Sequence, residues 1–259
     1  MLSKYFETDE QNEPTKIKQI MDKLPVHEVI VTPHDFFFYS SREFNTRSIV
    51  NKFMGNYALM YAFNQQTKGI HRTTSTNKSH YRKDLRRIST YITPASPCER
   101  EAIIQAKKIR WKDHETENHT YNALGESLAF TIVKAEYNYP NLGSYEKFTP
   151  LCSFKCFAIG NARPGIIRWG KKLVPCRVSY REVKNPTIKT GTFSPSHPIN
   201  TADVIIDPES VSSCSVVYTR PANLLIGTRL TGTFIEGQVN GRKVQIALPK
   251  LSLYPAVFS

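Results

Sequence analysis

The side chains best suited to chemistry in this sequence are lysines and arginines gathered in two stretches. Residues 68–112 carry 12 basic side chains against three acidic ones, and residues 161–189 carry eight against one. These stretches therefore hold net charges of +9 and +7 in a chain of net charge +13, so the remainder is slightly acidic. Basic charge placed in this way is typical of a face that binds a polyanion, and it predicts a nucleic-acid partner.

Both stretches also combine charge with glycine or aromatic side chains. In residues 160–172 the glycines Gly160, Gly165 and Gly170 alternate with basic residues and Trp169. Glycine lets a backbone approach phosphate groups, Lys and Arg neutralise them, and an aromatic ring stacks on a base. In residues 81–112 Tyr81 and Trp111 stand beside basic residues. We expect the two stretches to fold next to each other into one cationic cradle for single-stranded nucleic acid, with ordinary charged turns as the alternative.

The sequence offers little for catalysis or metal binding. No P-loop, GxGxxG, HExxH or GxSxG motif is present. His34 and Asp35 are adjacent, and adjacent residues of an extended chain point to opposite faces, so we expect a structural role for them. Cys152 and Cys156 form the only close cysteine pair, with no further ligand at zinc spacing. We therefore predict a binding protein that is not an enzyme and has no cofactor or metal.

Compartment follows from two absences in the sequence. No apolar run reaches the roughly 18 residues needed to span a bilayer. The first ten residues, MLSKYFETDE, lack the apolar segment of a secretory signal. We expect a cytoplasmic protein without a membrane partner.

Hydrophobic periodicity predicts mostly strands around one helix. The helix is expected over residues 49–61, capped by Asn45 or Thr46, because apolar residues recur there at three- and four-residue spacing. In the segment 174–183, apolar residues alternate with Arg177 and Arg181, so one face of that strand is expected to be buried and the other to line a charged groove. Asn240-Gly241 predicts a type I′ hairpin turn. Strands are expected at 26–32, 88–92, 130–136, 153–159, 174–183, 231–236 and 243–248, residues 113–119 are expected to form a turn, and residues 99–110 also fit a basic amphipathic helix.

This order of elements predicts an α+β fold built on an antiparallel sheet. A ferredoxin-like (βαββαβ) core with a long basic insertion between its second and third strands accommodates the pattern. We expect a polar N-terminal extension at 1–24, the core at 25–200 with the insertion at about 67–122, and a β-rich C-terminal extension at 201–259 packed on the core.

Several short segments, in one order, resemble a known family. They are HDFFF at 34–38 with SRE at 41–43, NYALMYA at 56–62, YITPA at 91–95, TYNA at 120–123, NYPN at 138–141 and IRWGK at 167–171. In this order they are similar to the type I-D CRISPR subunit called Csc-one, a member of the Cas-five family. The match runs from about residue 34 to residue 183.

The resemblance implies a role in antiviral defence as a subunit of a type I-D Cascade complex. Cas-five proteins have a ferredoxin-like, RRM-related core with a thumb, which here corresponds to about residues 67–122. They hold the 5′ handle of the CRISPR RNA (crRNA) and cap a row of backbone (Cas-seven-like) subunits. They also contact the large (Cas-ten-like) subunit, and through the complex they meet target double-stranded DNA.

Twelve residues are the predicted RNA contacts. They are Arg42, Arg82, Lys83, Arg86, Arg87, Lys107, Lys108, Arg110, Arg168, Trp169, Lys171 and Lys172. Two alternatives remain open. Some Cas-five relatives cut guide RNA with Tyr, His and Lys side chains, for which His34, Tyr39, Tyr81 and Lys83 are candidates. A protein-only scaffold, with basic faces against acidic partners, is the other.

Overall fold

A computed structural model describes most of the chain from residue 24 onward. The described residues are 24–44, 47–65, 81–98, 101–104, 107–110, 116–124, 140–170, 173–206, 209, 211, 214–219 and 221–258. Among these, at positions within 40–49, at 82 and within 101–146, the structure describes the backbone alone. The strand predicted at 130–136 lies outside the described residues. Within them, no helix has the length and apolar character to cross a membrane.

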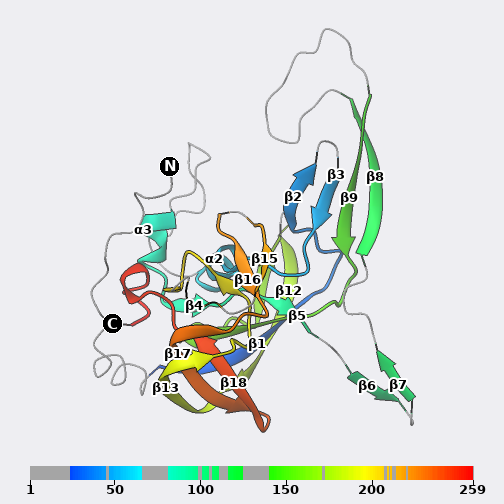
Figure 1. The fold of residues 1–259 in the computed structure, drawn as a ribbon. Helices are drawn as coiled ribbons and strands as arrows, with labels where there is room; N and C mark the ends of the chain where they lie inside the picture. Colours follow the sequence, from blue (N-terminus) through cyan, green and yellow to red (C-terminus); the bar gives the residue numbers. More distant parts are fainter. Residues whose placement is uncertain are drawn as a thin grey trace.

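The centre of the structure, where Figure 1 labels β1, β4, β5 and β12, is an antiparallel sheet. Its order is β11-β12-β1-β10-β4, with β5 also paired to β10. Its strands are β1 (Val26–Pro33), β4 (Thr90–Ile92), β5 (Ser96–Pro97), β10 (Phe154–Gly160), β11 (Ile166–Trp169) and β12 (Val174–Glu182). The strands predicted at 26–32, 88–92, 153–159 and 174–183 are therefore confirmed, since β-branched and apolar residues dominate them. The antiparallel sheet of the predicted fold class is confirmed, but the described part contains few helices.

The helix α2 (Asn56–Phe63) is shorter than predicted. Its periodicity predicts a start at residue 49, but Arg47–Val50 forms strand β3 instead. Met54 is also extended, exchanging backbone hydrogen bonds with Ala95 at 2.9 and 3.0 Å. The helix therefore starts only after Gly55, whose backbone is extended. The helix lies against β4 and β11, and its buried side chains form part of the hydrophobic core.

A four-stranded sheet and a separate hairpin lie away from the central sheet in Figure 1. Strands β2 (Ser40–Phe44), β3 (Arg47–Val50), β9 (Pro140–Phe148) and β8 (Thr116–Leu124) form one sheet in that order, and β6 (Glu101–Ile104) pairs with β7 (Lys107–Arg110). The basic helix considered for 99–110 is thus a hairpin, and the turn predicted at 113–119 gives way to β8 from Thr116. The apolar spacing of so short a segment is compatible with a helix or with a strand. Here the pairing of β6 with β7 favours the strand.

The C-terminal third adds two further sheets. Their orders are β13-β17-β18 and β14-β16-β15. The strands are β13 (Lys184–Phe193), β14 (Ile199–Asn200), β15 (Ser215–Val217), β16 (Leu224–Ile226), β17 (Leu230–Val239) and β18 (Arg242–Ala247), followed by the 3-10 helix η3 (Leu251–Leu253). Asn240 and Gly241 both have positive φ, as a type I′ turn requires, so that prediction is confirmed.

One buried carboxylate links this third to the helix. Asp203 is fully buried and accepts hydrogen bonds from Asn56 Nδ2 at 2.6 Å, Tyr57 OH at 2.9 Å and Tyr254 OH at 2.6 Å. Tyr91 OH is at 3.5 Å. Asn56 and Tyr57 belong to α2 and Tyr254 follows η3, so a single side chain joins elements that are far apart in sequence.

Candidate nucleic-acid interface

A pocket of 380 Å³ lies on the side of the central sheet that carries Glu28, Lys155, Arg177 and Arg181. We call this side the open face. The opposite side carries Val29, Val31, Phe154, Cys156, Cys176 and Val178, which are buried together with residues of α2. The pocket is lined by Glu28, Ile30, Thr32, His34, Cys98, Leu151, Ser153, Lys155, Arg177, Ser179, Arg181 and Arg242.

Strand alternation and register bring the cations of the open face together. Thr32 pairs with Arg177, Ile30 with Ser179 and Lys155, and Glu28 with Arg181. Because side chains on one face recur every second residue, the basic residues of β10 and β12 flank β1 on both sides. Neighbouring strands lie about 4.8 Å apart, so these cations are close to one another. Arg242, from the β17–β18 hairpin, lines the same pocket.

The pocket is strongly cationic. Four of its lining side chains are basic and one, Glu28, is acidic. Glu28 is 1% exposed and lies 3.4 Å from Arg181 and 3.7 Å from Arg242, measured between carboxylate oxygens and guanidinium nitrogens. Thr32 and Ser153 share a hydrogen bond of 2.9 Å between their hydroxyl groups. Arginine, lysine and hydroxyl groups around an open pocket are the groups that contact nucleic-acid phosphates.

The second basic stretch contributes Arg168 to this same face. In β11, Ile167 and Trp169 are buried whereas Ile166 and Arg168 are exposed. Ile167 pairs with the buried Cys176, so Arg168 lies on the open face, although it does not line the pocket. Its guanidinium donates to the Leu173 carbonyl at 3.3 Å.

The prediction that Trp169 stacks on a base is wrong. Its ring is 1% exposed and packs against Phe37, Tyr39 and Phe154, with centroid distances of 4.5, 5.8 and 5.6 Å. Both faces of the ring are therefore unavailable to nucleic acid. Strand alternation turns the indole toward the core at the same step that turns Arg168 outward.

The family assignment comes from comparison of the whole chain. The family model described as "Type I-D CRISPR-associated protein Cas5/Csc1" matches residues 24–254. The chain belongs to this family. It is thus a type I-D Cas5 subunit of a CRISPR complex, as the ordered short segments of the sequence predicted.

The other comparisons add less about this Cas5/Csc1 family member. Among curated proteins, none matches it. Among solved structures, it is similar to a chain of "the Type III-B Cmr-beta bound to cognate target RNA and AMPPnP". The TM-score is 0.44 and the sequence identity 11%, over 79% of this chain and 86% of that one. A likeness of this size carries no functional argument.

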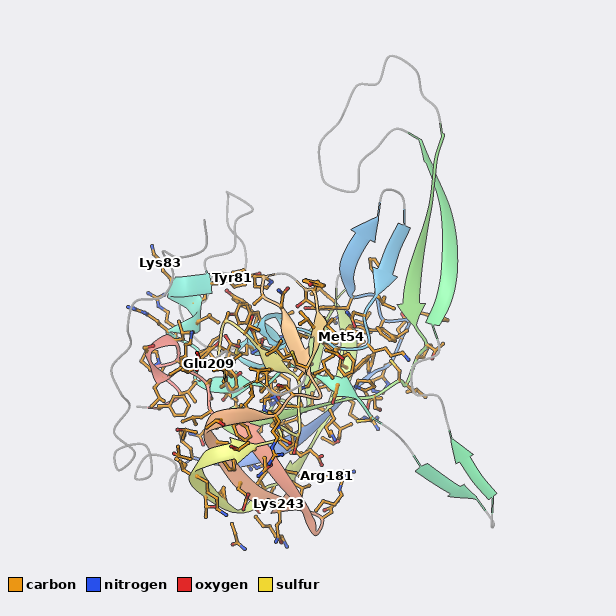
Figure 2. The ribbon with its side chains drawn as sticks, viewed as in Figure 1. Met54, Tyr81, Lys83, Arg181, Glu209 and Lys243 are labelled. Carbon is orange, nitrogen blue, oxygen red and sulfur yellow. The ribbon has the colours of Figure 1, made fainter. Side chains whose placement is uncertain are left out.

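The first basic stretch is found elsewhere on this Cas5/Csc1 chain. Helix α3 (Tyr81–Leu85) packs through Tyr81 on Tyr57 and Tyr61 of α2, with centroid distances of 5.1 and 6.2 Å. Lys83, Arg86 and Arg87 around it are exposed. Figure 2 shows Lys83 and Arg181 on well-separated parts of the molecule.

A single cradle formed by both stretches is therefore wrong for the described residues. The segment from α3 runs directly into β4, whereas β11 is the strand at the other edge of the sheet. Among the remaining predicted contacts, Lys171 and Lys172 lie outside the described residues. The side chains of Arg42, Arg82, Lys107, Lys108 and Arg110 also lie outside them, although strands or α3 hold their backbone.

The residues considered for RNA cleavage do not all come together. His34 lines the open-face pocket, whereas Tyr39 is partly buried against Trp169. Burial and the nearby Tyr81 of α3 raise the pKa of Tyr39 to about 12. None of Tyr39, Tyr81 and Lys83 lines the pocket that contains His34. In the part of the chain that the structure describes, no group of three His, Cys, Asp or Glu side chains is placed to hold a metal ion.

Two of the four basic pocket residues, Lys155 and Arg242, were missed by sequence reasoning. Lys155 lies in a predicted strand, and alternation with Phe154 and Cys156 was a signal that could have placed it on the open face. Arg242 gave no such signal, because it reaches the pocket from a hairpin more than two hundred residues after β1.

Proposed function

We propose that this chain is the non-catalytic RNA-binding subunit of a type I-D CRISPR complex, and that the open-face pocket grips the 5′ handle of the crRNA. The observation that carries the proposal is the pocket itself, in which Lys155, Arg177, Arg181 and Arg242 outnumber one buried carboxylate. Family membership supports a place in a CRISPR complex.

The sheet topology supports an RNA-binding core. Without β5 and β11, which also belong to the sheet, the strands β1, β4, β10 and β12 follow one another in the chain and lie in the order 4-1-3-2 with antiparallel pairing. This is the order of a ferredoxin-like core, with α2 in the place of its first helix. RRM domains share this core and bind single-stranded RNA on the open face of the sheet.

The proposed mechanism is neutralisation and positioning. Lys155, Arg177 and Arg168 contact successive phosphates. The hydroxyl groups of Thr32 and Ser179 form hydrogen bonds with the sugar-phosphate backbone. The exposed cations around α3 form a second surface. We assign this surface to contact with neighbouring subunits or with their RNA. Those subunits include the backbone subunit that this chain caps and the large subunit that meets target DNA.

Fluorescence anisotropy with a labelled RNA carrying the repeat-derived 5′ handle tests the proposal. Removing one cation that binds a phosphate makes the slope of log affinity against log salt less steep by about 0.7 for a single strand. Lys155→Ala and Arg177→Ala should each show this change between about 50 and 200 mM salt and weaken binding about tenfold. Arg229→Ala is the control, because it removes an exposed arginine that does not line the pocket.

Three outcomes would count against the proposal. Wild-type affinity and slope in both pocket variants would remove the open face as the interface. Weakened binding by Arg86→Ala, with wild-type binding by Arg177→Ala, would move the interface to α3. Shortening of the RNA by the purified wild-type chain would contradict the non-catalytic role.

A further inference from the structure

Two arginines from different sheets converge on one buried carboxylate at the pocket. Arg181 belongs to β12 of the central sheet, and Arg242 begins β18 of the C-terminal sheet. Both reach Glu28 on β1, at 3.4 and 3.7 Å. The guanidinium-bearing side chains stay 49% and 63% exposed while Glu28 is 1% exposed. The pair therefore spans the junction between the two sheets and faces solvent.

The carboxylate leaves most of the hydrogen-bonding capacity of this pair unused. Each guanidinium carries five N–H donors, and well-formed contacts between guanidinium and carboxylate are about 2.7–2.9 Å long. Both distances to Glu28 are longer. One negative charge between two positive ones also leaves the group of three with a net charge of +1, beside Arg177 and Lys155 in the same pocket.

A second carboxylate with two cationic partners, Glu236 in the same C-terminal sheet, shows the contrast. Glu236 lies 2.5 Å from Lys189 and 2.7 Å from Lys243, and Gln245 Nε2 donates to it at 3.0 Å. These contacts hold the pKa of Glu236 down at about 2. Close contacts of this kind are what a group that only joins strands requires. The two contacts of Glu28, at 3.4 and 3.7 Å, are longer than the two ion pairs of Glu236.

We infer that Arg181 and Arg242 bind one phosphodiester group of the RNA between them, so that the C-terminal hairpin forms one wall of the RNA groove. The inference rests on the proposed function and extends it to a residue outside the central sheet. Two forks on one phosphate provide parallel N–H donors to its oxygens, the geometry in which arginine is strongest. RNA then bridges the two sheets at the point where Arg181 and Arg242 both reach Glu28.

The alternative is a junction with no ligand, in which the two arginines only neutralise Glu28. The hairpin itself supplies a matched pair of variants that separates the two cases. Arg242 and Lys243 are neighbours on β18, carry the same charge and are 63% and 64% exposed, but only Arg242 lines the pocket. Changing either to Ala removes one positive charge and one ion pair from the same strand.

The test measures binding of the full chain to the labelled handle RNA as a function of salt. Arg242→Ala should weaken binding about tenfold and make the salt slope less steep by about 0.7, whereas Lys243→Ala should leave the slope unchanged. Arg181→Ala should match Arg242→Ala. Because both arginines share one phosphate, the double variant should change the slope no more than either single variant, a non-additivity that a double-mutant cycle detects. Thermal melting confirms that each variant is folded, and Arg242→Lys replaces the double variant if that one does not fold.

Every outcome bears on the inference. Equal binding by Arg242→Ala and Lys243→Ala, with weakened binding by Arg177→Ala, overturns the inference and leaves the proposed function standing. Additive effects in the double variant show two separate phosphates and also overturn it. Wild-type binding by Arg177→Ala and Arg242→Ala together overturns the proposed function itself. An Arg242→Lys variant with full wild-type affinity shows that charge suffices without the fork, and contradicts shared phosphate binding.

Discussion

Removing the carboxylate of Asp203 should lower the stability of this protein more than any single change at its surface. The side chain is fully buried and accepts three short hydrogen bonds, from Asn56, Tyr57 and Tyr254. In Asp203→Ala those three donors remain buried without their acceptor. Because α2 and the chain end meet at this carboxylate, the substitution should loosen the attachment of the C-terminal third.

The magnitude follows from the three hydrogen bonds. A buried donor left without an acceptor costs about 1–3 kcal/mol, and removing a buried charge recovers part of its desolvation penalty. We therefore expect Asp203→Ala to lower the free energy of unfolding by about 4 kcal/mol, which corresponds to about 8–16 °C in melting temperature. Tyr254→Phe removes one hydrogen bond of 2.6 Å and should cost about 2 kcal/mol. Tyr91→Phe, at 3.5 Å, should cost under about 1 kcal/mol and serves as the control.

The pH dependence gives an independent measure of the same group. Burial raises the pKa of Asp203 above its ordinary value, although Asn56, Tyr254 and Tyr57 oppose the shift. The folded state therefore holds this proton more tightly than the unfolded state does. The stabilisation of wild type relative to Asp203→Ala should shrink as pH rises from 3.8 through the folded-state pKa. Chemical denaturation at several pH values measures it.

Two results would refute this account of the junction. Equal melting temperatures for Tyr254→Phe and Tyr91→Phe would show that the difference between the 2.6 and 3.5 Å distances has no energetic meaning. A wild-type melting temperature in Asp203→Ala would show that the carboxylate does not hold the C-terminal third to α2.

Two further stability predictions concern His197 and Gly170. His197 is buried, donates from Nδ1 to the Pro198 carbonyl and accepts from the Ala247 N–H at Nε2, so it is neutral, and burial lowers its pKa to about 4. Since the unfolded value is 6.5, stability should fall by about 3 kcal/mol as pH drops from 6.5 to 4, and His197→Gln should abolish that slope in urea titrations. Gly170 has φ +79° and its Cβ would lie 2.6 Å from Phe37 Cε2, so Gly170→Ala should cost about 2 kcal/mol or more by thermal melting. Gly165→Ala, with nothing within 4 Å, should be nearly neutral, and equal destabilisation in both would contradict the packing argument.

The central strands were predictable because their side-chain period is local. Alternation in 174–183 predicted both the buried row of Val174, Cys176 and Val178 and the exposed row with Arg177 and Arg181. The Asn240-Gly241 turn was predictable for the same reason, since two positive φ angles demand those residues. In each case, neighbouring residues contain the whole signal.

The predictions that were wrong concern residues whose structure depends on contacts with segments far away in the sequence. Apolar spacing at 49–61 suited a helix, but pairing of β3 with β2 and of Met54 with Ala95 held the chain extended as far as Gly55. Trp169 sits in a basic, glycine-rich segment that suggested base stacking, yet the aromatic rings around it come from Phe37, Tyr39 and Phe154. Spacing along the sequence contains no information about those contacts.

The candidate interface shows how charge density along a sequence differs from charge density on a surface. The first basic stretch has the larger number of basic residues, but its exposed Lys83, Arg86 and Arg87 lie at α3, which packs on α2 and not on the pocket. The pocket instead collects Lys155, Arg177 and Arg181 from strands that are paired through β1, and Arg242 from a separate sheet. Pairing register converts isolated cations into a cluster, because residues that are far apart in sequence occupy adjacent positions on one face. A pocket assembled in this way depends on the C-terminal third staying attached, so the RNA contact that we propose for Arg242 also depends on the Asp203 junction.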